Sequence, residues 1–230
     1  MYSHFLFDAD NTLLDFDKAQ KLSFCSLLDD FSVQYSDEIY QQYETINHSL
    51  WNLFEVGKID SQTVQEKRFE LFFQQINIKI TGRDANDLYQ SKLSKQSILI
   101  PYATEVCKEL SNSAELTIVT NGVGKTQQER IKNSAINKYI SHVVISEDIG
   151  CAKPNKPFFD ETFKIINRKP IDKILIVGDS LSSDIRGGIL AGIDTCWFNR
   201  HEQVVPTDIN IQYVITDLRQ LLSIQNKCKI

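Results

Sequence analysis

The sequence contains no long run of apolar residues. Its 230 residues hold no stretch approaching the roughly 20 apolar residues that are needed to span a bilayer. Residues 1–4 lead directly into a short apolar run, without the positively charged segment and cleavage site of a signal peptide. We therefore expect a protein that resides in the cytoplasm and has no membrane partner.

The sequence also lacks an excess of basic residues. It has 25 Lys and Arg against 30 Asp and Glu, a formal net charge of -5 at pH 7. Proteins that bind nucleic-acid polymers usually present a basic stripe to the phosphate backbone. The charge balance argues against such a partner, whereas a small phosphorylated metabolite needs only a local positive site. The oligomeric state is open between a monomer and a homodimer.

Paired cysteines and clusters of histidines are absent as well. The cysteines are odd in number and scattered without a CxxC pair: Cys25, Cys107, Cys151, Cys196 and Cys228. The histidines show no metal-ligand spacing: His4, His48, His142 and His201. The pattern predicts reduced cysteines, with neither a disulfide framework nor a zinc site. We expect the histidines to be structural or surface residues.

What the sequence does contain is a pair of carboxylates just after its first apolar run. Residues 5–7 predict a buried strand, and Asp8 and Asp10 follow where that strand ends. In an open α/β sheet, groups at the carboxyl end of a strand converge on a ligand-binding crevice. Two carboxylates there repel each other unless a cation or a shared proton offsets the repulsion. The pair therefore suggests a divalent ion, a proton carrier or both, with two solvated aspartates in a loop as the alternative.

The hydrophobic period becomes helical over residues 17–97. Four helices are expected there, at about 17–31, 36–54, 61–76 and 84–93. Asp17 is a candidate cap for the first helix, Ser36 or Asp37 for the second, and Gly57 is expected to end the second. This helical segment interrupts a second domain, which must be assembled from residues 1–16 and 98–230.

From residue 98 onward, strands and helices alternate, which predicts a parallel sheet with helices on both faces. The expected strands are 116–120, 143–146, 174–178, 195–198 and 213–215, and the expected helices are 103–111, 126–134, 156–166, 184–191 and 217–226. Small residues gather near the end of the fourth of these helices and predict its close packing on the sheet: Gly187, Gly188, Ala191 and Gly192. The predicted fold class is α/β, a Rossmann-like parallel sheet with an inserted helical domain.

Three further motifs accompany this alternation. They are Thr120-Asn121-Gly122, Lys153-Pro154, and Gly178-Asp179-Ser180 with Asp184. Together with DADNT at residues 8–12, they resemble in order and spacing the signature of the haloacid dehalogenase-like hydrolases. The segments FDADNTLLDFD, NHSLW, VISEDIGCAKPNKPFFD and DIRGGILAGIDTCWFN resemble the pyrimidine 5′-nucleotidase branch of that superfamily.

The resemblance implies a phosphatase that forms an aspartyl-phosphate. Asp8 would attack phosphorus, and Asp10 would protonate the leaving oxygen and later activate water, a role typically worth about 10² to 10⁴ in rate. Lys153 would neutralise Asp8 against the phosphate. Thr120, Asn121 and Gly122 would bind the phosphate oxygens with Lys153. The substrate would be a nucleoside 5′-monophosphate with a pyrimidine base, such as UMP, dUMP, dTMP or a modified form of these.

The resemblance also implies Mg²⁺ and a substrate-selecting cap. Asp8, Asp179 and the backbone carbonyl of Asp10 would ligate the ion, and Asp184 would orient its waters or Lys153. The inserted helical domain, residues 17–97, would be the cap. The candidate contacts to a pyrimidine are Phe16 at the entrance to the cap and Asn47 and Trp51 on its second helix, although an aromatic residue at helical spacing is more often buried in a core.

The motifs also have features in common with proteins of other functions. The GVGKT segment at 122–126 resembles the end of a P-loop, but the first glycine would fall at Val119, inside a strand. The dehalogenase branch keeps no acid at the position of Asp10. A phosphatase for another small ester, such as a sugar phosphate or phosphoglycolate, and a phosphomutase stay open. So does a receiver-like signalling module phosphorylated on Asp8, although Asp10 would shorten the life of its signal.

Overall fold

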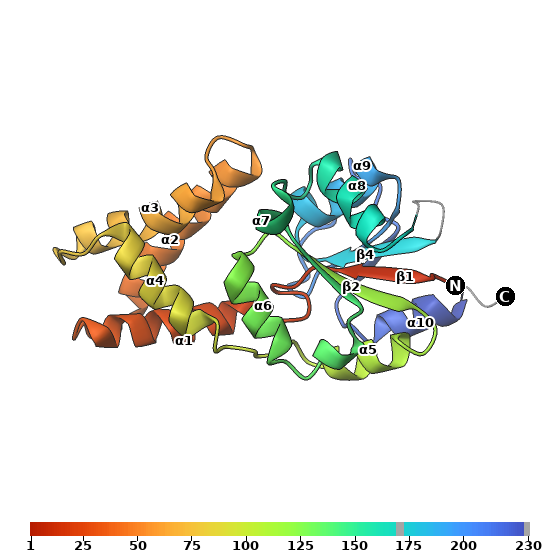
Figure 1. Ribbon diagram of the computed structural model, residues 1–230, viewed down its shortest axis with the longest axis horizontal. Coiled ribbons are helices and arrows are strands. Elements are labelled where there is room, and N and C mark those ends of the chain that lie inside the picture. The colour runs from red at the N-terminus through yellow and green to blue at the C-terminus, as the bar shows by residue number, and fades with distance from the viewer. Residues whose placement is uncertain (169–172, 228–230) are drawn as a thin grey trace. The chain divides into compact units, whose positions relative to one another are not determined.

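The computed structural model describes residues 1–168 and 173–227. The chain forms two compact units, the first made of Met1–Phe16 with Ser97–Ile230 and the second of Asp17–Gln96 (Figure 1). The first boundary lies between residues 16 and 17, where the sequence analysis placed it, and the second lies between residues 96 and 97, one residue earlier than expected. The cysteines within the described ranges are free thiols, namely Cys25, Cys107, Cys151 and Cys196, and Cys228 lies outside these ranges.

The first unit is built on a six-stranded parallel sheet, which confirms the predicted fold class. The strands are β1 (His4–Phe7), β2 (Glu115–Thr120), β3 (His142–Ile145), β4 (Ile174–Gly178), β5 (Asp194–Phe198) and β6 (Tyr213–Ile215). Their order is β3-β2-β1-β4-β5-β6. The chain fills one side of β1 and then crosses to the other, so the strand order reverses between β1 and β4. Open α/β sheets bind ligands outside the strands' carboxyl ends at such a point.

Helices connect the strands of this sheet. They are α5 (Ala103–Leu110), α6 (Gly124–Lys132), α7 (Ser146–Ile149), α8 (Lys156–Ile165), α9 (Arg186–Ala191) and α10 (Gln220–Lys227), with a 3₁₀ turn at Asn137–Tyr139 and a π turn at Leu181–Ile185. The strand expected at residues 143–146 is wrong at its end, because Ser146 begins α7. The helix expected from residue 184 begins at Arg186, because Ile185 still donates to the carbonyl of Ser180 in the wider π turn.

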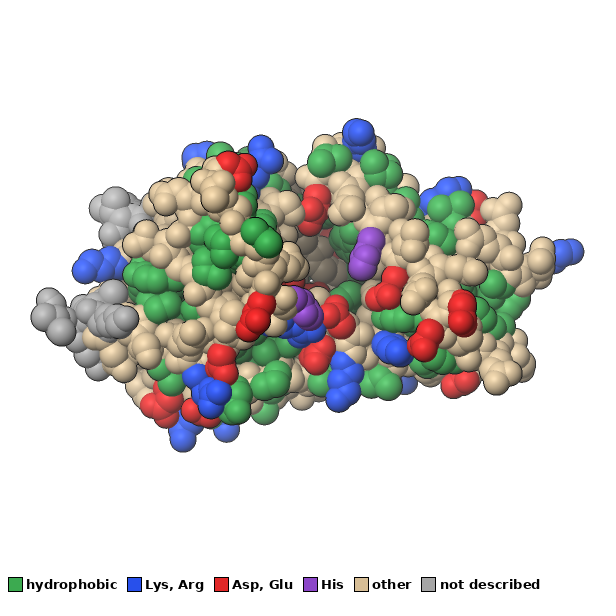
Figure 2. Space-filling view, turned by 180° about the vertical axis from the view of Figure 1, so that it is seen from behind, with side chains coloured by type: hydrophobic (Ala, Val, Ile, Leu, Met, Phe, Trp, Pro, Cys, Tyr) green, Lys and Arg blue, Asp and Glu red, His purple; other side chains and the backbone are tan. Residues whose placement is uncertain are grey.

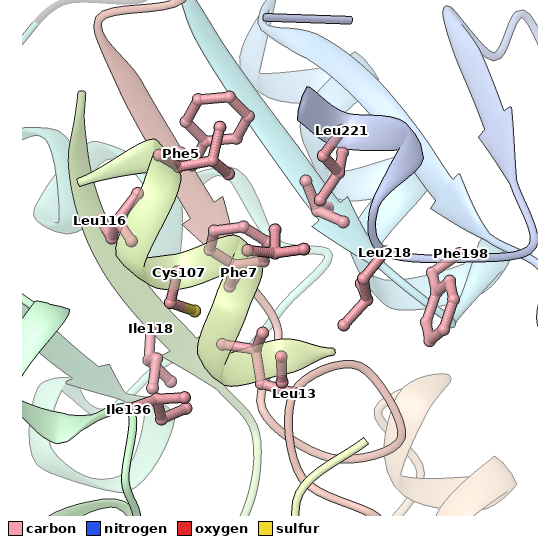
Figure 3. Close-up of a cluster of buried hydrophobic side chains, with 14 of the residues drawn as sticks. Phe5, Phe7, Leu13, Cys107, Leu116, Ile118, Ile136, Phe198, Leu218 and Leu221 are labelled. Carbon is pink, nitrogen blue, oxygen red and sulfur yellow. The ribbon is translucent and has the colours of Figure 1, made fainter. Parts of the chain in front are cut away.

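The strands of the sheet bury side chains on both faces. Phe5 and Phe7 lie in one core with Cys107 of α5 and Leu221 of α10 (Figure 3). Leu6 points to the opposite face and lies in a second core, which contains the aromatic side chains of α8. Burying one such side chain fully contributes about 1.5–3 kcal/mol. The two cores therefore fix the position of β1, and with it the start of the loop that carries Asp8 and Asp10.

Gly187 and Gly188 of α9 pack closely as the sequence predicts, whereas Gly192 follows the end of this helix with a φ of 74° and open space where a Cβ would lie. A Cβ added at Gly187 would overlap Phe159 of α8, and one at Gly188 would overlap Ile176 and Thr195. The helix backbone therefore approaches α8 and the sheet more closely than a larger residue would allow. This packing supports the segment that carries Asp184.

The second unit consists of four helices. They are α1 (Phe16–Asp30), α2 (Asp37–Glu55), α3 (Ser61–Gln75) and α4 (Gly82–Leu93). The Ser36 side chain accepts from the backbone N–H of Ile39, as expected of the cap of α2. Gly57 has a φ of 71° just after the end of that helix, in agreement with its predicted role. The prediction that Asp17 caps the first helix is wrong, because α1 already begins at Phe16 and Asp17 lies inside its first turn.

Aromatic side chains form the core of the second unit. The rings of Phe24 and Tyr43 stack with their centroids 4.4 Å apart, and Phe72 meets the Phe24 ring edge-on. Offset and edge-on pairs add about 0.5–1.5 kcal/mol beyond the area they bury. The ring centroids of Phe69 in α3 and Tyr89 in α4 lie 5.1 Å apart, so aromatic contacts join all four helices in one core.

Two observations describe the length of the helices and the charge of the surface. No helix within the described ranges is both long enough and apolar enough to cross a membrane. On the face shown in Figure 2, Lys and Arg side chains are interspersed with Asp and Glu. This face therefore presents charges of both signs.

Candidate active site

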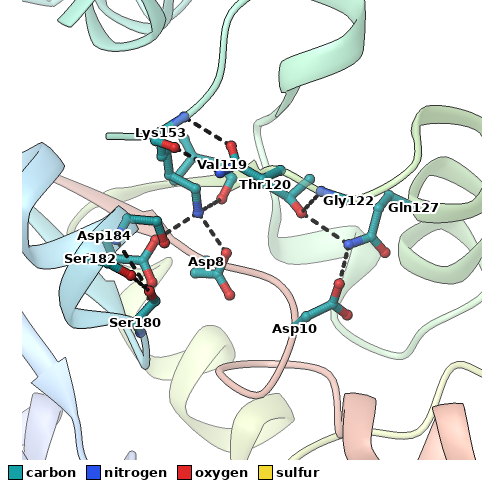
Figure 4. A network of polar contacts seen from close by, with 12 residues as sticks. Asp8, Asp10, Val119, Thr120, Gly122, Gln127, Lys153, Ser180, Ser182 and Asp184 are labelled. Carbon is teal, nitrogen blue, oxygen red and sulfur yellow. Dashed lines mark hydrogen bonds and ion pairs between the residues drawn. The ribbon is translucent and has the colours of Figure 1, made fainter. Parts of the chain in front are cut away.

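Three strand ends meet at the carboxyl edge of the sheet. Asp8 follows β1, Thr120 ends β2, and Asp179 follows β4. Strand β1 pairs in parallel with both of the others, with Phe7 opposite Val177 of β4. The polar residues that follow these strands therefore emerge next to one another, as Figure 4 shows for Asp8 and Thr120.

The ammonium group of Lys153 is the centre of a buried polar network (Figure 4). Its Nζ donates to Oδ1 of Asp8 at 2.6 Å, to Oδ1 of Asp184 at 2.7 Å and to the carbonyl of Val119 at 2.8 Å. An ammonium has three donors, so these bonds satisfy it although the residue is only 2% exposed. The network places a fixed positive charge beside Asp8.

Asn121 holds the backbone of Lys153. Its Nδ2 donates to the Lys153 carbonyl and its Oδ1 accepts from the Lys153 N–H, both at 2.9 Å. The sequence analysis expects this amide to bind phosphate. In the structure, both ends of the amide are used to fix the residue that carries the ammonium.

Three carboxylates gather around the same point. Asp8, Asp179 and Asp184 each offer an oxygen within 4.8 Å of the others. The second oxygen of Asp184 accepts from the backbone N–H of Ser180, and the carbonyl of Asp179 accepts from the indole of Trp197. These bonds orient the two later acids.

Gly178 makes room for this acidic cluster. A Cβ at this position would overlap the carboxylate of Asp184, which lies directly over the end of β4. The glycine before Asp179 is therefore required by the close approach of the second acid. This requirement is a steric reason for the GD pair seen in the sequence.

The surroundings shift the pKa values of the clustered groups. Burial raises the pKa of Asp8 to about 7, against the lowering effect of Lys153 and with the help of Asp184 and Asp10. Burial followed by the charge of Asp8 also raises the pKa of Asp179 well above its ordinary value. Burial opposes the charge of Lys153, but Asp184 and Asp8 outweigh it and raise the pKa of the ammonium. The cluster is an electrostatically crowded site in which one added positive charge would relieve the carboxylates.

The carboxylate of Asp10 lies apart from this cluster and contacts α6. Its Oδ1 accepts from Nη1 of Arg130 at 2.5 Å, and its Oδ2 accepts from Nε2 of Gln127 at 2.6 Å. Figure 4 shows Asp10 and Gln127 on one side of the site and Lys153 on the other. The structure thus separates the two carboxylates of the first motif into different environments.

Thr120 links the two environments. Its hydroxyl oxygen accepts from the backbone N–H of Gly122 and from Nε2 of Gln127, both at 3.0 Å. With its oxygen accepting two bonds, the hydroxyl hydrogen remains the group that Thr120 can donate to a phosphate oxygen. The Gly122 N–H, expected to approach phosphate, is engaged by Thr120 here. The absence of a Cβ at Gly122 makes room for the Gln127 side chain.

The structure therefore brings most of the predicted site residues together, and it gives Asp184 a different place from the one expected. Asp8, Lys153 and Asp179 lie together, and Thr120 lies close by. Asp184, expected only to orient ligand waters or Lys153, contributes its carboxylate to the cluster of possible metal ligands. The sequence analysis assigned to the ion only the backbone carbonyl of Asp10, and the Asp10 carboxylate is not part of this cluster of described side chains.

Sequence reasoning missed Gln127 and Arg130. Both residues are 1% exposed, although their side chains are polar. Their spacing of three places them on the same face of a helix, and this helix directly follows the Thr120 motif. A polar face at that location was the available signal that α6 contacts the acidic residues.

The candidate base-contacting residues are only partly supported. Asn47 is not available to a pyrimidine, because its Nδ2 donates to Gln20, its Oδ1 accepts from Arg68, and it is 2% exposed. Trp51 is partly exposed on α2 and meets Phe54 edge-on, so it is not part of the fully buried core. The Phe16 ring lies 5.6 Å from the Arg130 guanidinium.

The GVGKT segment does not form a phosphate loop. Gly124 begins α6, and its backbone N–H donates to a carboxylate oxygen of Glu147 at 2.8 Å. In a P-loop, N–H groups of this kind face phosphate oxygens. An acidic side chain takes that place here, in agreement with the sequence argument against a nucleotide triphosphatase.

Curated relatives align with almost the whole chain. HAD-hydrolase YfnB of Bacillus subtilis is 36% identical over 225 residues, which cover 98% of this chain and 96% of the relative. Pyrimidine 5′-nucleotidase YjjG of Escherichia coli is 34% identical over 215 residues and covers 94% of each chain. Pyrimidine 5′-nucleotidase PynA of Streptococcus pneumoniae is 32% identical over 227 residues, covering 98% of this chain and 96% of the relative.

Structure and family comparisons agree with these alignments. A crystal structure of YfnB bound to magnesium matches with a TM-score of 0.93, covering 98% of this chain and 99% of that chain. The family model described as haloacid dehalogenase-like hydrolase matches residues 5–198. These matches, and the four motifs gathered at the carboxyl edge of the sheet, establish that the chain belongs to the haloacid dehalogenase-like hydrolases.

Proposed function

We propose that this hydrolase is a Mg²⁺-dependent phosphatase that acts on nucleoside 5′-monophosphates, with preference for pyrimidines such as UMP, dUMP and dTMP. The observation that carries the reaction is the buried contact of Asp8 with Lys153, next to a second acid, Asp10, that is held separately. The substrate class rests on YjjG and PynA, two relatives named as pyrimidine 5′-nucleotidases.

In the first half-reaction, a carboxylate oxygen of Asp8 attacks phosphorus. The new bond to Asp8 forms as the bond from phosphorus to the nucleoside oxygen breaks, and Asp10 gives its proton to that leaving oxygen. Lys153 stays beside Asp8 and offsets the charge of the approaching phosphate. The hydroxyl of Thr120 donates to a phosphate oxygen, so the negative charge meets donors already in place.

In the second half-reaction, water releases the phosphate. Asp10, now ionised, takes a proton from a water molecule as the water oxygen attacks phosphorus. The bond between phosphorus and Asp8 breaks, which returns the Asp8 carboxylate and inorganic phosphate. One residue thereby acts first as an acid and then as a base, and the enzyme ends with the protons it began with.

The acidic cluster fits Mg²⁺. Asp8, Asp179 and Asp184 offer only oxygen donors, the type hard cations prefer, and these lie within 4.8 Å of one another. Burial raises the pKa values of Asp8 and Asp179 although Lys153 opposes the rise, and a divalent cation would add the positive charge that favours their ionised forms. These carboxylates, with the backbone carbonyl of Asp10 as a further ligand, would hold the ion. When bound, it would offset the charge of the phosphate oxygens.

We propose further that the second unit is a cap that selects the substrate. The resemblance to capped members of the family supports this role, and Trp51 is its remaining partly exposed candidate for stacking on a base. The enzyme is proposed to act in the cytoplasm on a small phosphate ester, as a monomer or a homodimer.

A substrate panel tests the proposal. Phosphate release is measured from UMP, dUMP, dTMP, purine monophosphates, sugar phosphates and phosphoglycolate, with and without Mg²⁺, for the wild type and Asp8→Asn. We expect Mg²⁺-dependent release, strongest with pyrimidine nucleotides and lost in the variant. A preference for sugar phosphates or phosphoglycolate would retain the phosphatase and overturn the nucleotide assignment. No release at all, with a long-lived phosphorylated Asp8, would favour the signalling module.

A further inference from the structure

The two contacts of the Asp10 carboxylate come from one helix face. Arg130 binds one carboxylate oxygen at 2.5 Å and Gln127 binds the other at 2.6 Å, so rotation of the carboxylate is restrained at both ends. Arg130 Nη1 also donates to Oε1 of Gln127 at 2.9 Å. Because these distances are those of charge-assisted or short hydrogen bonds, the three side chains form a well-defined unit.

This unit continues to the phosphate side of the site. Nε2 of Gln127 donates both to Asp10 and to the hydroxyl of Thr120, at 2.6 and 3.0 Å. One amide therefore fixes the distance between the proposed proton carrier and the proposed phosphate donor. The Arg130 guanidinium also lies 5.6 Å from the centroid of the Phe16 ring, within the range of a cation–π contact.

Stability alone is a weak explanation for this arrangement. Arg130 and Gln127 are both 1% exposed, so the guanidinium end of the ion pair is withdrawn from water, whereas the Asp10 side chain is 26% exposed. Removing charges from water is costly, and apolar residues of similar size often replace buried ion pairs without loss of stability. A precise carboxylate orientation is what such an arrangement supplies, and proton transfer requires it.

We propose that Gln127 and Arg130 are positioning residues that hold the Asp10 carboxylate for both of its proton transfers. The inference rests on the proposed function and adds to it two residues that act through Asp10 and touch no reacting atom. Gln127 orients Asp10 relative to Thr120, and Arg130 prevents the carboxylate from turning away between the two half-reactions.

The dependence on the leaving group tests this role. A nucleoside oxygen needs a proton as it leaves, whereas p-nitrophenolate leaves without one. With Arg130→Met, we expect kcat on a nucleoside monophosphate to fall by about 10²-fold, the lower end of what general acid–base catalysis supplies. With p-nitrophenyl phosphate, the first release of p-nitrophenol should keep its wild-type rate, and only the later turnovers, which need Asp10 as a base, should slow.

The coupling to Asp10 is measured in a double-mutant cycle. In an Asp10→Asn background, adding Arg130→Met or Gln127→Met should change kcat by less than about threefold, because residues that act as one unit are not additive. The inference would be overturned if the reduction in kcat of each double mutant equalled the product of the reductions in its two single mutants. It would also be overturned if Arg130→Met slowed the first step equally on the nucleotide and on p-nitrophenyl phosphate.

Matched variants separate positioning from folding. Gln225 of α10 is also buried and hydrogen-bonded, to the backbone of Tyr2, so Gln225→Met removes a similar amide elsewhere in the first unit. We expect it to leave kcat within about twofold of the wild type. Gln127→Met is compared with it at equal folded fraction, determined by near-UV circular dichroism. Equal kcat for these two variants would overturn the inference.

The proposed function and this inference fail in different ways. Wild-type enzyme that releases phosphate from neither substrate would overturn the function, before any variant is compared. Active wild-type enzyme whose Arg130→Met and Gln127→Met forms keep full kcat on the nucleotide would leave the phosphatase intact and overturn the positioning role alone.

Discussion

Each of the two units contains a buried cationic side chain, but the hydrogen-bond partners of the two cations differ in charge. In the α/β unit, Lys153 lies between the carboxylates of Asp8 and Asp184. In the helical unit, Arg68 is equally buried, yet it donates to the neutral amide oxygens of Asn47 and Asn86 at 3.1 and 3.0 Å. A cation held among carboxylates creates a site for a negatively charged substrate and a metal ion. A cation held among amides joins helices α2, α3 and α4.

The surrounding side chains differ in the same way. Arg68 lies over the rings of Phe69 and Tyr89, at 4.7 and 4.9 Å from their centroids, within an aromatic core. The carboxylates around Lys153 have pKa values shifted by burial and by one another. Shifted pKa values collect where chemistry requires them. The comparison teaches that burial of a charge is by itself no sign of catalysis, and that the nature of its partners distinguishes the two cases.

Lys153→Met should produce the largest change. We expect kcat for phosphate release to fall about 10³-fold, because the substitution removes the positive charge that offsets Asp8 against the incoming phosphate. The measurement is steady-state phosphate release at saturating Mg²⁺ and substrate. A fall in kcat smaller than tenfold would contradict the comparison, because Lys153, like Arg68, would then have a mainly structural role.

Gly178→Ala should cost about 10²-fold in kcat, since displacing a catalytic group by about 1 Å can have this effect. The added Cβ would overlap the Asp184 carboxylate. We also expect weaker Mg²⁺ binding, measured by calorimetry. Gly188→Ala is the matched control, because its Cβ would overlap only apolar groups of Ile176 and Thr195. It should lower stability by about 1–3 kcal/mol and leave Mg²⁺ affinity unchanged.

Acid should weaken the α/β unit through His4. Burial lowers its pKa from 6.5 to about 4, and its Nε2 lies 2.8 Å from the hydroxyl of Thr117. Because the folded state disfavours protonation, this contribution to stability is complete above pH 6.5 and is lost as the pH falls toward 4. The loss should reach at most about 3 kcal/mol.

Urea unfolding of His4→Gln between pH 7 and 4 checks this contribution. The variant should show a flatter dependence of unfolding free energy on pH than the wild type. His48→Gln, at an exposed position on α2, is the control and should retain the wild-type slope. Identical slopes for both variants would contradict the assignment to His4.

Arg68→Met should have the smallest effect on turnover. It leaves the amide oxygens of Asn47 and Asn86 without a charged donor, which costs about 1–3 kcal/mol in unfolding free energy. We expect kcat per folded molecule to stay within about threefold of the wild type, because the residue serves the packing of its own unit. Urea unfolding and phosphate release measure the two quantities. A fall in kcat comparable to that of Lys153→Met would remove the distinction between the two cations.

Local patterns were sufficient for most of the fold. Short apolar runs predicted the strands because a doubly covered strand has no solvent-facing side. Ser36 and Gly57 marked the limits of α2 through rules that act within a few residues. Ser146 was misassigned, because an apolar run does not reveal where helical hydrogen bonding begins. The start of α9 was also misplaced, since a π turn precedes it.

The sequence by itself determined which groups the site would contain. Asp8, Thr120 and Asp179 directly follow or end strands, so their meeting at one edge follows from the parallel sheet alone. Tertiary structure alone decided what each group faces. Asp10 meets Gln127 and Arg130 across 117 and 120 positions of the chain, and Asp8 meets Lys153 across 145. A local pattern reports backbone preference and burial, whereas the direction of a side chain depends on partners that only folding brings within reach.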